Sequence, residues 1–191
     1  MELVFATNNQ HKLKEIKNAL GNSFELKSLA DLNFKEDIPE THETLEENAM
    51  EKAEHIYSRF NVNCFADDTG LEIEALNGEP GVYSARYAGE NPTFDDNMNK
   101  VLLKLSSETR RSARFRTVIA LILDGEKYYF EGEVNGEILV SKSGRDGFGY
   151  DPIFKPEGCN QSFAEMSLDL KNKISHRGKA VKKLVKFLKT L

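Results

Sequence analysis

Apolar runs and helical periodicity alternate along the first part of the chain. Residues 3–6 are continuously apolar, which predicts a short buried strand. A helix is predicted to follow over residues 12–20, with Asn8 or Asn9 as its N-cap. Its apolar positions recur at the spacing of one helical face: Leu13, Ile16 and Leu20. A strand that leads directly into a helix indicates an α/β arrangement.

A second helix and a second strand are predicted next. Thr44 and Glu47 have the spacing of a capping box, so a helix is expected to begin there. One stripe of this helix is apolar: Leu45, Ala49, Ala53, Ile56 and Phe60. Residues 62–66 predict another buried strand, and Asp67 and Asp68 are expected just past its C-terminal end.

The second half of the chain predicts a hairpin between two helices. The expected elements follow in this order: a turn at 78–81, a helix over 93–105, a strand over 113–123, a hairpin turn at 124–125, a returning strand over 128–134, an extended piece at 137–140 and a helix over 177–191. This order predicts an α/β fold in which helices flank a mixed sheet, with a second lobe built around the hairpin.

The composition is that of an ordinary globular protein. The chain has 191 residues, of which 39% are hydrophobic, and a net charge of -5, so we expect one domain over residues 1–191. A negative net charge argues against nucleic acid as a partner. No apolar run reaches the roughly 20 residues of a membrane helix, so no membrane contact is expected. The two cysteines show no metal or disulfide spacing, and a reducing cytoplasm is the expected compartment.

Residues 147–153 (GFGYDPI) are the most informative local feature of the chain. Two glycines flank Phe148, which allows close backbone approach to a flat ligand and leaves an aromatic ring for stacking. Asp151 precedes Pro152, so its backbone is expected to be extended. The segment predicts contact with the face and edge of a nucleic base.

The turn from the first strand into the first helix is a candidate phosphate site. Backbone N–H groups at a helix start attract anions, residues 7–9 add polar side chains, and Lys12 adds a full charge. The segment is not a Walker loop, and by itself it is more typical of an ordinary strand-to-helix turn with an asparagine cap. Lys52, beside an apolar helical stripe, either extends to water or reaches phosphates.

Asp67 and Asp68 are candidate ligands of Mg²⁺, a hard cation that prefers oxygen donors. A carboxylate at this point can also take a proton from water. A polar turn explains the same two residues equally well. Glu40, which follows a proline, is a weaker candidate for a further oxygen ligand.

His176 and Arg177 are adjacent nitrogen donors near the start of the final helix. Such donors favour a 6-oxo purine, whose O6 accepts hydrogen bonds, over adenine, whose N6 donates them. The alternatives are a helix-capping histidine and a solvated arginine.

Together these segments resemble the inosine triphosphate pyrophosphatase family, the Ham1/RdgB-type non-canonical purine nucleotide pyrophosphatases. The resemblance covers nearly the whole chain. It rests on seven blocks in order: ATNN at 6–9 with Lys12 and Glu15, DIPE at 37–40, ENA at 47–49 with Lys52 and Ala53, ADDTGL at 66–71, GVYSARY at 81–87, GFGYDPIF at 147–154, and SHRG at 175–178. One block alone is a weak signal, whereas seven in the same order are specific.

The resemblance implies a mixed α/β fold with a cleft between two lobes, usually as a homodimer. It implies Mg²⁺-dependent hydrolysis of ITP, dITP and XTP to the monophosphate and pyrophosphate. The implied triphosphate ligands are Thr7, Asn8, Asn9, Gln10, His11, Lys12 and Lys52. Glu40 and Asp68 are the implied metal ligands, and Asp68 is also the implied general base. Thr69 would lie beside the substrate. The base would be surrounded by Phe148, Gly149, Tyr150, Asp151, Lys171, His176 and Arg177.

Two positions depart from the family pattern. Asn8 stands where many members have glycine, which narrows the room for a phosphate to approach the backbone. Thr69 stands where many bacterial members have serine, and the hydroxyl is kept.

Two other functions stay open. A Maf-type pyrophosphatase would act on pyrimidine or modified nucleotides, but the Ser-x-Ser-Pro-Arg-Arg start of that type is absent. A non-enzymatic nucleotide or RNA binder would use the lysine-rich final helix, although in an acidic chain a solvated helix face explains those lysines better. Such a binder predicts binding without pyrophosphate release.

Overall fold

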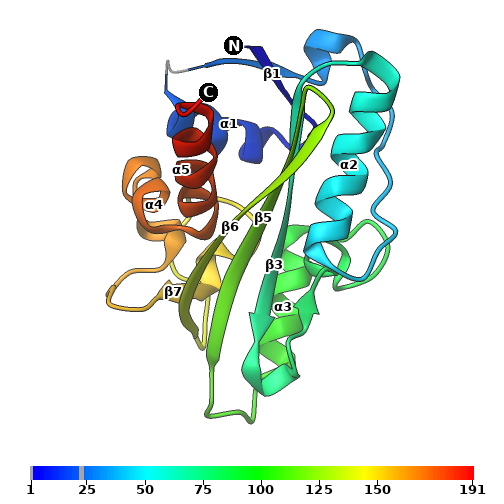
Figure 1. The fold of residues 1–191 in the computed structure, drawn as a ribbon. Helices are drawn as coiled ribbons and strands as arrows, with labels where there is room; N and C mark the ends of the chain where they lie inside the picture. Colours follow the sequence, from blue (N-terminus) through cyan, green and yellow to red (C-terminus); the bar gives the residue numbers. More distant parts are fainter. Residues whose placement is uncertain (1, 22–23) are drawn as a thin grey trace. The chain divides into compact units, whose positions relative to one another are not determined.

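The computed structural model describes residues 2–21 and 24–191 and contains one mixed sheet (Figure 1). Its strands are β1 (Glu2–Phe5), β2 (Glu25–Ser28), β3 (Cys64–Ile73), β4 (Pro80–Gly81), β5 (Ser112–Leu123), β6 (Glu126–Ile138) and β7 (Phe154–Pro156). They are ordered β2-β1-β3-β5-β6-β7, and β4 pairs with β3. β1 runs parallel to β2 and β3, whereas β4 and β7 are antiparallel to their partners, which confirms the predicted mixed sheet.

The predicted helices are confirmed, and one short helix was not predicted. The α-helices are α1 (Gln10–Leu20), α2 (Leu45–Phe60), α3 (Phe94–Lys104), α4 (Leu168–Ile174) and α5 (His176–Leu188). The side chains of Asn9 and Thr44 cap α1 and α2 as expected. The unpredicted helix is α4, whose 7 residues are too few to show an apolar period.

The described residues form two compact units. The first comprises the described residues of Met1–Asp68 together with Thr117–Gly132 and His176–Leu191, and the second comprises Thr69–Arg116 and Glu133–Ser175. The hairpin therefore contributes its tip to the first unit and its base to the second.

The first unit has its own apolar core. The rings of Phe5 and Phe65 stack with their centroids 4.7 Å apart and an interplanar angle of 10°. Helices α1 and α5 pack together over these strands, and α2 covers the other side (Figure 1). Burying each such side chain contributes about 1.5–3 kcal/mol, so this core fixes the strand ends that carry the polar residues.

The second unit is built around a cluster of aromatic side chains. Phe115 lies against Phe154 with ring centroids 4.7 Å apart, and Phe163 stacks on Phe154 at 5.4 Å. Tyr150 is buried in the same cluster, and its hydroxyl donates a hydrogen bond to the Ser84 carbonyl at 2.8 Å. This cluster holds the 147–153 segment in place.

Three local predictions are wrong. β3 continues to Ile73, so Asp67 and Asp68 lie inside a strand and not beyond its end, because pairing with β4 and β5 extends the strand past its apolar run. The piece expected at 137–140 is not a separate element, because residues 137–138 are the end of β6 and residues 139–140 belong to no strand. Asp151 begins a 3₁₀ turn that is closed by the hydrogen bond from Ile153 N to the Tyr150 carbonyl at 3.0 Å, and this turn outweighs the extended preference before proline.

Among the described residues, no helix combines the length and the apolar character that crossing a membrane requires.

Candidate active site

The loop between β1 and α1 carries the predicted phosphate ligands. Asn9 Oδ1 accepts hydrogen bonds from the backbone N–H groups of His11 at 2.9 Å and Lys12 at 3.1 Å. Asn9 N donates to Thr7 Oγ1 at 3.2 Å, so both side chains order the loop itself. Asn8 is exposed and its amide donates to the Glu36 carbonyl at 3.2 Å, and its φ is not positive. The loop geometry therefore does not require glycine at Asn8.

A buried chain of charges lies behind this loop. Lys12 Nζ lies 3.0 Å from Asp67 Oδ1, and Arg177 Nε and Nη2 each lie 3.1 Å from Asp67 Oδ2. Arg177 Nη1 also pairs with Glu15 Oε2. Both carboxylate oxygens of Asp67 thus contact cations, and Arg177 is held between two carboxylates.

Burial makes this network electrostatically strong. Desolvation opposes the charged form of Asp67, but Lys12, Arg177 and Lys52 more than offset it, so the pKa of Asp67 is well below its ordinary value. Desolvation likewise opposes the charge on Arg177, yet Asp67 and Glu15 raise its pKa above the ordinary value. The charged forms of Asp67 and Arg177 are therefore favoured, and their ion pairs hold both side chains in one orientation.

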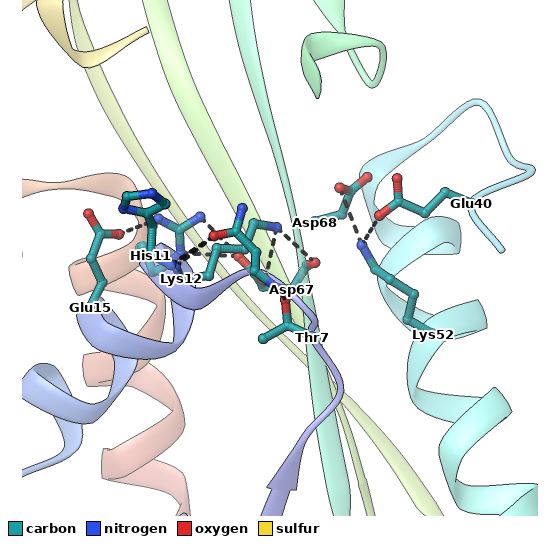
Figure 2. Close-up of polar contacts among 10 residues, drawn as sticks. Thr7, His11, Lys12, Glu15, Glu40, Lys52, Asp67 and Asp68 are labelled. Atoms are coloured by element: carbon teal, nitrogen blue, oxygen red, sulfur yellow. Dashed lines mark hydrogen bonds and ion pairs between the residues drawn. The ribbon is translucent and has the colours of Figure 1, made fainter. Parts of the chain in front are cut away.

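A second charged group gathers around Lys52. Its ammonium donates to Glu40 Oε1 and lies 3.5 Å from Asp68 Oδ1 (Figure 2). The Lys52 side chain is only 8% exposed, so it does not extend to water. The structure therefore brings together the two implied metal ligands around one positive charge.

Asp67 and Asp68 enter different networks because they are neighbours in a strand. Successive strand side chains point to opposite faces, and Figure 2 shows Asp67 toward Lys12 and Asp68 toward Lys52. Burial raises the pKa of Asp68, with Glu40 and Asp67 adding to this effect against the pull of Lys52 and Lys12. The two carboxylates thus differ in their readiness to accept a proton, and Asp68 is the more basic.

The residues around Lys52 suit a hard cation. Within residues 2–21 and 24–191 no group of three His, Cys, Asp or Glu side chains gathers at one point. Magnesium sites for nucleotides usually need only one or two carboxylates, because waters and substrate phosphates complete the shell. Glu40 and Asp68, which already share an ammonium, fit that donor set.

Five of the seven predicted base-binding residues, Phe148 to Asp151 and Lys171, lie in the second unit, whereas His176 and Arg177 belong to the first. Lys171 Nζ lies 2.6 Å from Asp151 Oδ2, with both side chains 4% exposed. The same oxygen accepts a hydrogen bond from Phe148 N at 2.8 Å. Gly147 has φ +76, and a Cβ there would lie 2.1 Å from Asp151 Oδ2, so only glycine fits. Lys171 Nζ also lies over the Phe148 ring, 4.9 Å from its centroid.

The remaining predicted residues lie in varied surroundings. Thr69 is half-buried in β3, directly after Asp68. Gly149 has φ +62, a conformation that favours glycine. His176 is buried at the start of α5, whereas Gln10 and His11 are exposed in the first turn of α1. Their roles stay predictions.

Glu15 is the site residue to which sequence reasoning assigned no role. It lies on the buried face of α1, beside Ile16, and is only 4% exposed. A carboxylate on an apolar helical face signals a buried cation partner. That partner is Arg177, 162 residues away in the chain, so no local pattern could identify it.

Comparison with known proteins places the chain in a family. A model of the Ham1 family matches residues 3–187. The chain belongs to the Ham1 family. This confirms the resemblance inferred from the seven sequence blocks.

Relatives and solved structures of the family match along the full length. A dITP/XTP pyrophosphatase of Flavobacterium johnsoniae is 55% identical, covering 98% of this chain and 98% of its own. The Ham1 protein of Staphylococcus aureus has a TM-score of 0.89 and 43% identity, covering 100% of this chain and 99% of its own. A HAM1 protein from Coxiella burnetii has a TM-score of 0.91 and 38% identity, covering 100% of both chains. These matches confirm the predicted fold class.

Proposed function

We propose that this chain is a Mg²⁺-dependent nucleoside triphosphate pyrophosphatase that hydrolyses ITP, dITP and XTP to the monophosphate and pyrophosphate. The observation that carries the proposal is the cluster of Lys52, Glu40 and Asp68 in a member of the Ham1 family. A buried cation flanked by two carboxylates suits a metal–triphosphate substrate. The relatives named dITP/XTP pyrophosphatase support the substrate class. Removal of such nucleotides would keep them from polymerases.

Charged side chains would bind and orient the triphosphate. Lys12 and Lys52 supply full positive charges, and residues 7–11 supply polar groups at the start of α1. Asp67 holds Lys12 in place at 3.0 Å, so that cation is oriented before substrate binds. Preorganised charge of this kind stabilises the negative charge that develops on the phosphates during transfer.

Asp68 is the proposed general base. Its pKa is raised by burial, which makes it a better proton acceptor than an ordinary aspartate. It takes a proton from the attacking water as a new phosphorus–oxygen bond forms and the anhydride bond to the leaving group breaks. The products are the nucleoside monophosphate and pyrophosphate.

A metal would be held by Glu40 and Asp68. When bound, Mg²⁺ neutralises phosphate charge and lowers the pKa of water. Lys52, which lies between these carboxylates, would then turn its charge toward the phosphates.

Base recognition is assigned to the residues that the resemblance implies. Phe148 would stack on the base, and the buried Lys171 would contact the edge of the base together with the Phe148–Asp151 segment. His176 and Arg177 would favour a 6-oxo purine through donated hydrogen bonds. Thr69 would contact the substrate beside Asp68.

The remaining proposals concern organisation and location. We propose that residues 1–191 work as one domain of two lobes, that two copies form a homodimer, and that the enzyme acts in the cytoplasm on free nucleotides, without nucleic acid or a membrane. Light scattering of the purified protein tests the dimer: a mass near 43 kDa is expected for two chains of 21.6 kDa each.

Pyrophosphate release with Mg²⁺ tests the function directly. The substrates are ITP, dITP, XTP, ATP, GTP and the pyrimidine triphosphates, each with and without a chelator. We expect rapid release from the first three only, and none with the chelator. Release mainly from pyrimidine triphosphates would support the Maf-type alternative. Binding without release, weakened steeply by salt, would support a non-enzymatic binder.

A further inference from the structure

The Phe148 ring lies beside two side chains of the second unit, and the proposed function assigns a role to only one of them. One is Lys171, whose ammonium lies over the ring, 4.9 Å from the centroid. The other is Phe94, whose centroid lies 6.1 Å from that of Phe148 at an interplanar angle of 51°. Both distances fall in the attractive range for cation–π and aromatic pairs. Phe148 is therefore contacted by an aromatic residue to which sequence analysis gave no role.

Phe94 is carried by a firmly anchored helix end. It is the first residue of α3, and Thr93 and Asp96 form a capping box around it. Asn97 accepts a hydrogen bond from Ala88 N at 2.7 Å and donates to the Ala85 carbonyl at 3.1 Å. The first turn of α3 thus has little freedom to move, and Phe94 presents a fixed surface.

The same helix turn also contacts the chain that leads into Phe148. Lys142 donates to Asn99 Oδ1 at 2.7 Å and pairs with Asp95. Asp95 and Asn99 lie one turn apart on α3. Lys142 therefore anchors the chain that precedes the 147–153 segment to this helix. Two separate contacts therefore join α3 to the segment that presents Phe148.

Phe148 needs such support because of its sequence neighbours. Gly147 and Gly149 both have positive φ, at +76 and +62, and glycine has wide backbone freedom. Asp151 fixes the backbone at Phe148 N, but it does not set the direction of the ring. The contacts that Lys171 and Phe94 make with the ring itself orient it.

We propose that Phe94 is a positioning residue that sets the Phe148 ring for base stacking. The inference rests on the proposed function, in which Phe148 stacks on the purine. Because Lys171 lies over one face of the ring, a base would stack on the face turned away from it. Phe94 is 45% exposed, as expected for a side chain that supports a ligand-binding ring at the surface of the unit.

Kinetics of Phe94 variants test the proposal. Phe94→Ala should raise KM for ITP by about two- to tenfold, the value of one aromatic contact, with kcat within about twofold. Inhibition by inorganic tripolyphosphate, which has no base, should be unchanged. Phe94→Tyr keeps the ring and should restore KM. Leu103→Ala is the matched control, because Leu103 is an apolar residue of the same helix and is 74% exposed.

The outcomes separate the inference from the proposed function. An active wild type with an unchanged KM in Phe94→Ala would overturn the inference alone. An equal weakening of tripolyphosphate inhibition would also overturn it, because the effect would then not concern the base. A wild type that releases no pyrophosphate from any purine triphosphate would overturn the proposed function, and this inference with it.

Discussion

The two candidate substrate regions of this chain use charge differently. In the first unit, seven charged side chains form two separate groups of ion pairs: Lys12, Glu15, Asp67 and Arg177 in one, and Glu40, Lys52 and Asp68 in the other. In the second unit, one buried pair, Lys171 with Asp151, lies beside aromatic rings. Phosphates are the same in every nucleotide and call for charge, whereas bases differ in shape and hydrogen bonding. The comparison suggests that turnover and selectivity can be changed separately.

The largest effect is expected from Asp68→Asn. Loss of the general base should lower kcat by about 10²- to 10⁴-fold. Stability should change little, because two effects oppose each other: the raised pKa of Asp68 means that the fold disfavours its charged form, whereas buried Lys52 loses one of its two carboxylate partners. Pyrophosphate release and thermal unfolding measure the two quantities, and Glu126→Gln on the exposed hairpin is the control. Near-normal turnover would mean that another residue is the base.

Asp67→Asn, in contrast to Asp68→Asn, should lower the stability of the fold. It leaves the buried charges of Arg177 and Lys12 with one carboxylate fewer, which typically lowers the free energy of unfolding by about 3 kcal/mol. The lowered pKa of Asp67 also predicts a loss of stability, because the fold favours the charged form that this substitution removes. Denaturant unfolding of this variant beside Asp68→Asn makes the contrast. Equal stability of the two variants would show that the networks are not distinct.

Lys171→Met should affect the base and spare the phosphates. The change removes the partner of buried Asp151 and the cation over Phe148, so KM for ITP should rise by about tenfold or more. The inhibition constant of tripolyphosphate should stay the same. Lys173→Met, at an exposed position of the same helix, serves as the control. A parallel loss of tripolyphosphate inhibition would contradict the proposed division of roles.

The smallest effect is expected from Asn8→Gly, which restores the residue common in the family. Asn8 makes one exposed hydrogen bond to the Glu36 carbonyl, and its φ is not positive. Glycine should therefore change KM by less than about twofold and lower stability by about 0.5–1 kcal/mol through backbone freedom. Asn8→Ala separates the lost hydrogen bond from this freedom. A large gain in affinity with glycine would show that the side chain obstructs phosphate.

Sequence alone predicted most of the fold, and it named the candidate site residues, whose roles stay predictions. Helix periodicity and capping residues located α1, α2 and α3, because these signals lie within one or two turns of chain. The length of β3 was missed, because its polar second half is a strand only through its neighbours in the sheet. The 3₁₀ turn at Asp151 was missed for a similar reason, since contacts with Phe148 and Lys171 outweigh the local preference.

Residue identities along the chain were enough to determine the family, the α/β class and which side chains carry charge or rings, because these depend on composition and short-range spacing. Only the tertiary structure decided which charges meet. It separated Asp67 from Asp68, paired Glu15 with Arg177 and set Phe94 beside Phe148. The physical reason is that ion pairs and ring contacts form between residues brought close by the packing of distant strands and helices, and sequence spacing contains no record of those distances.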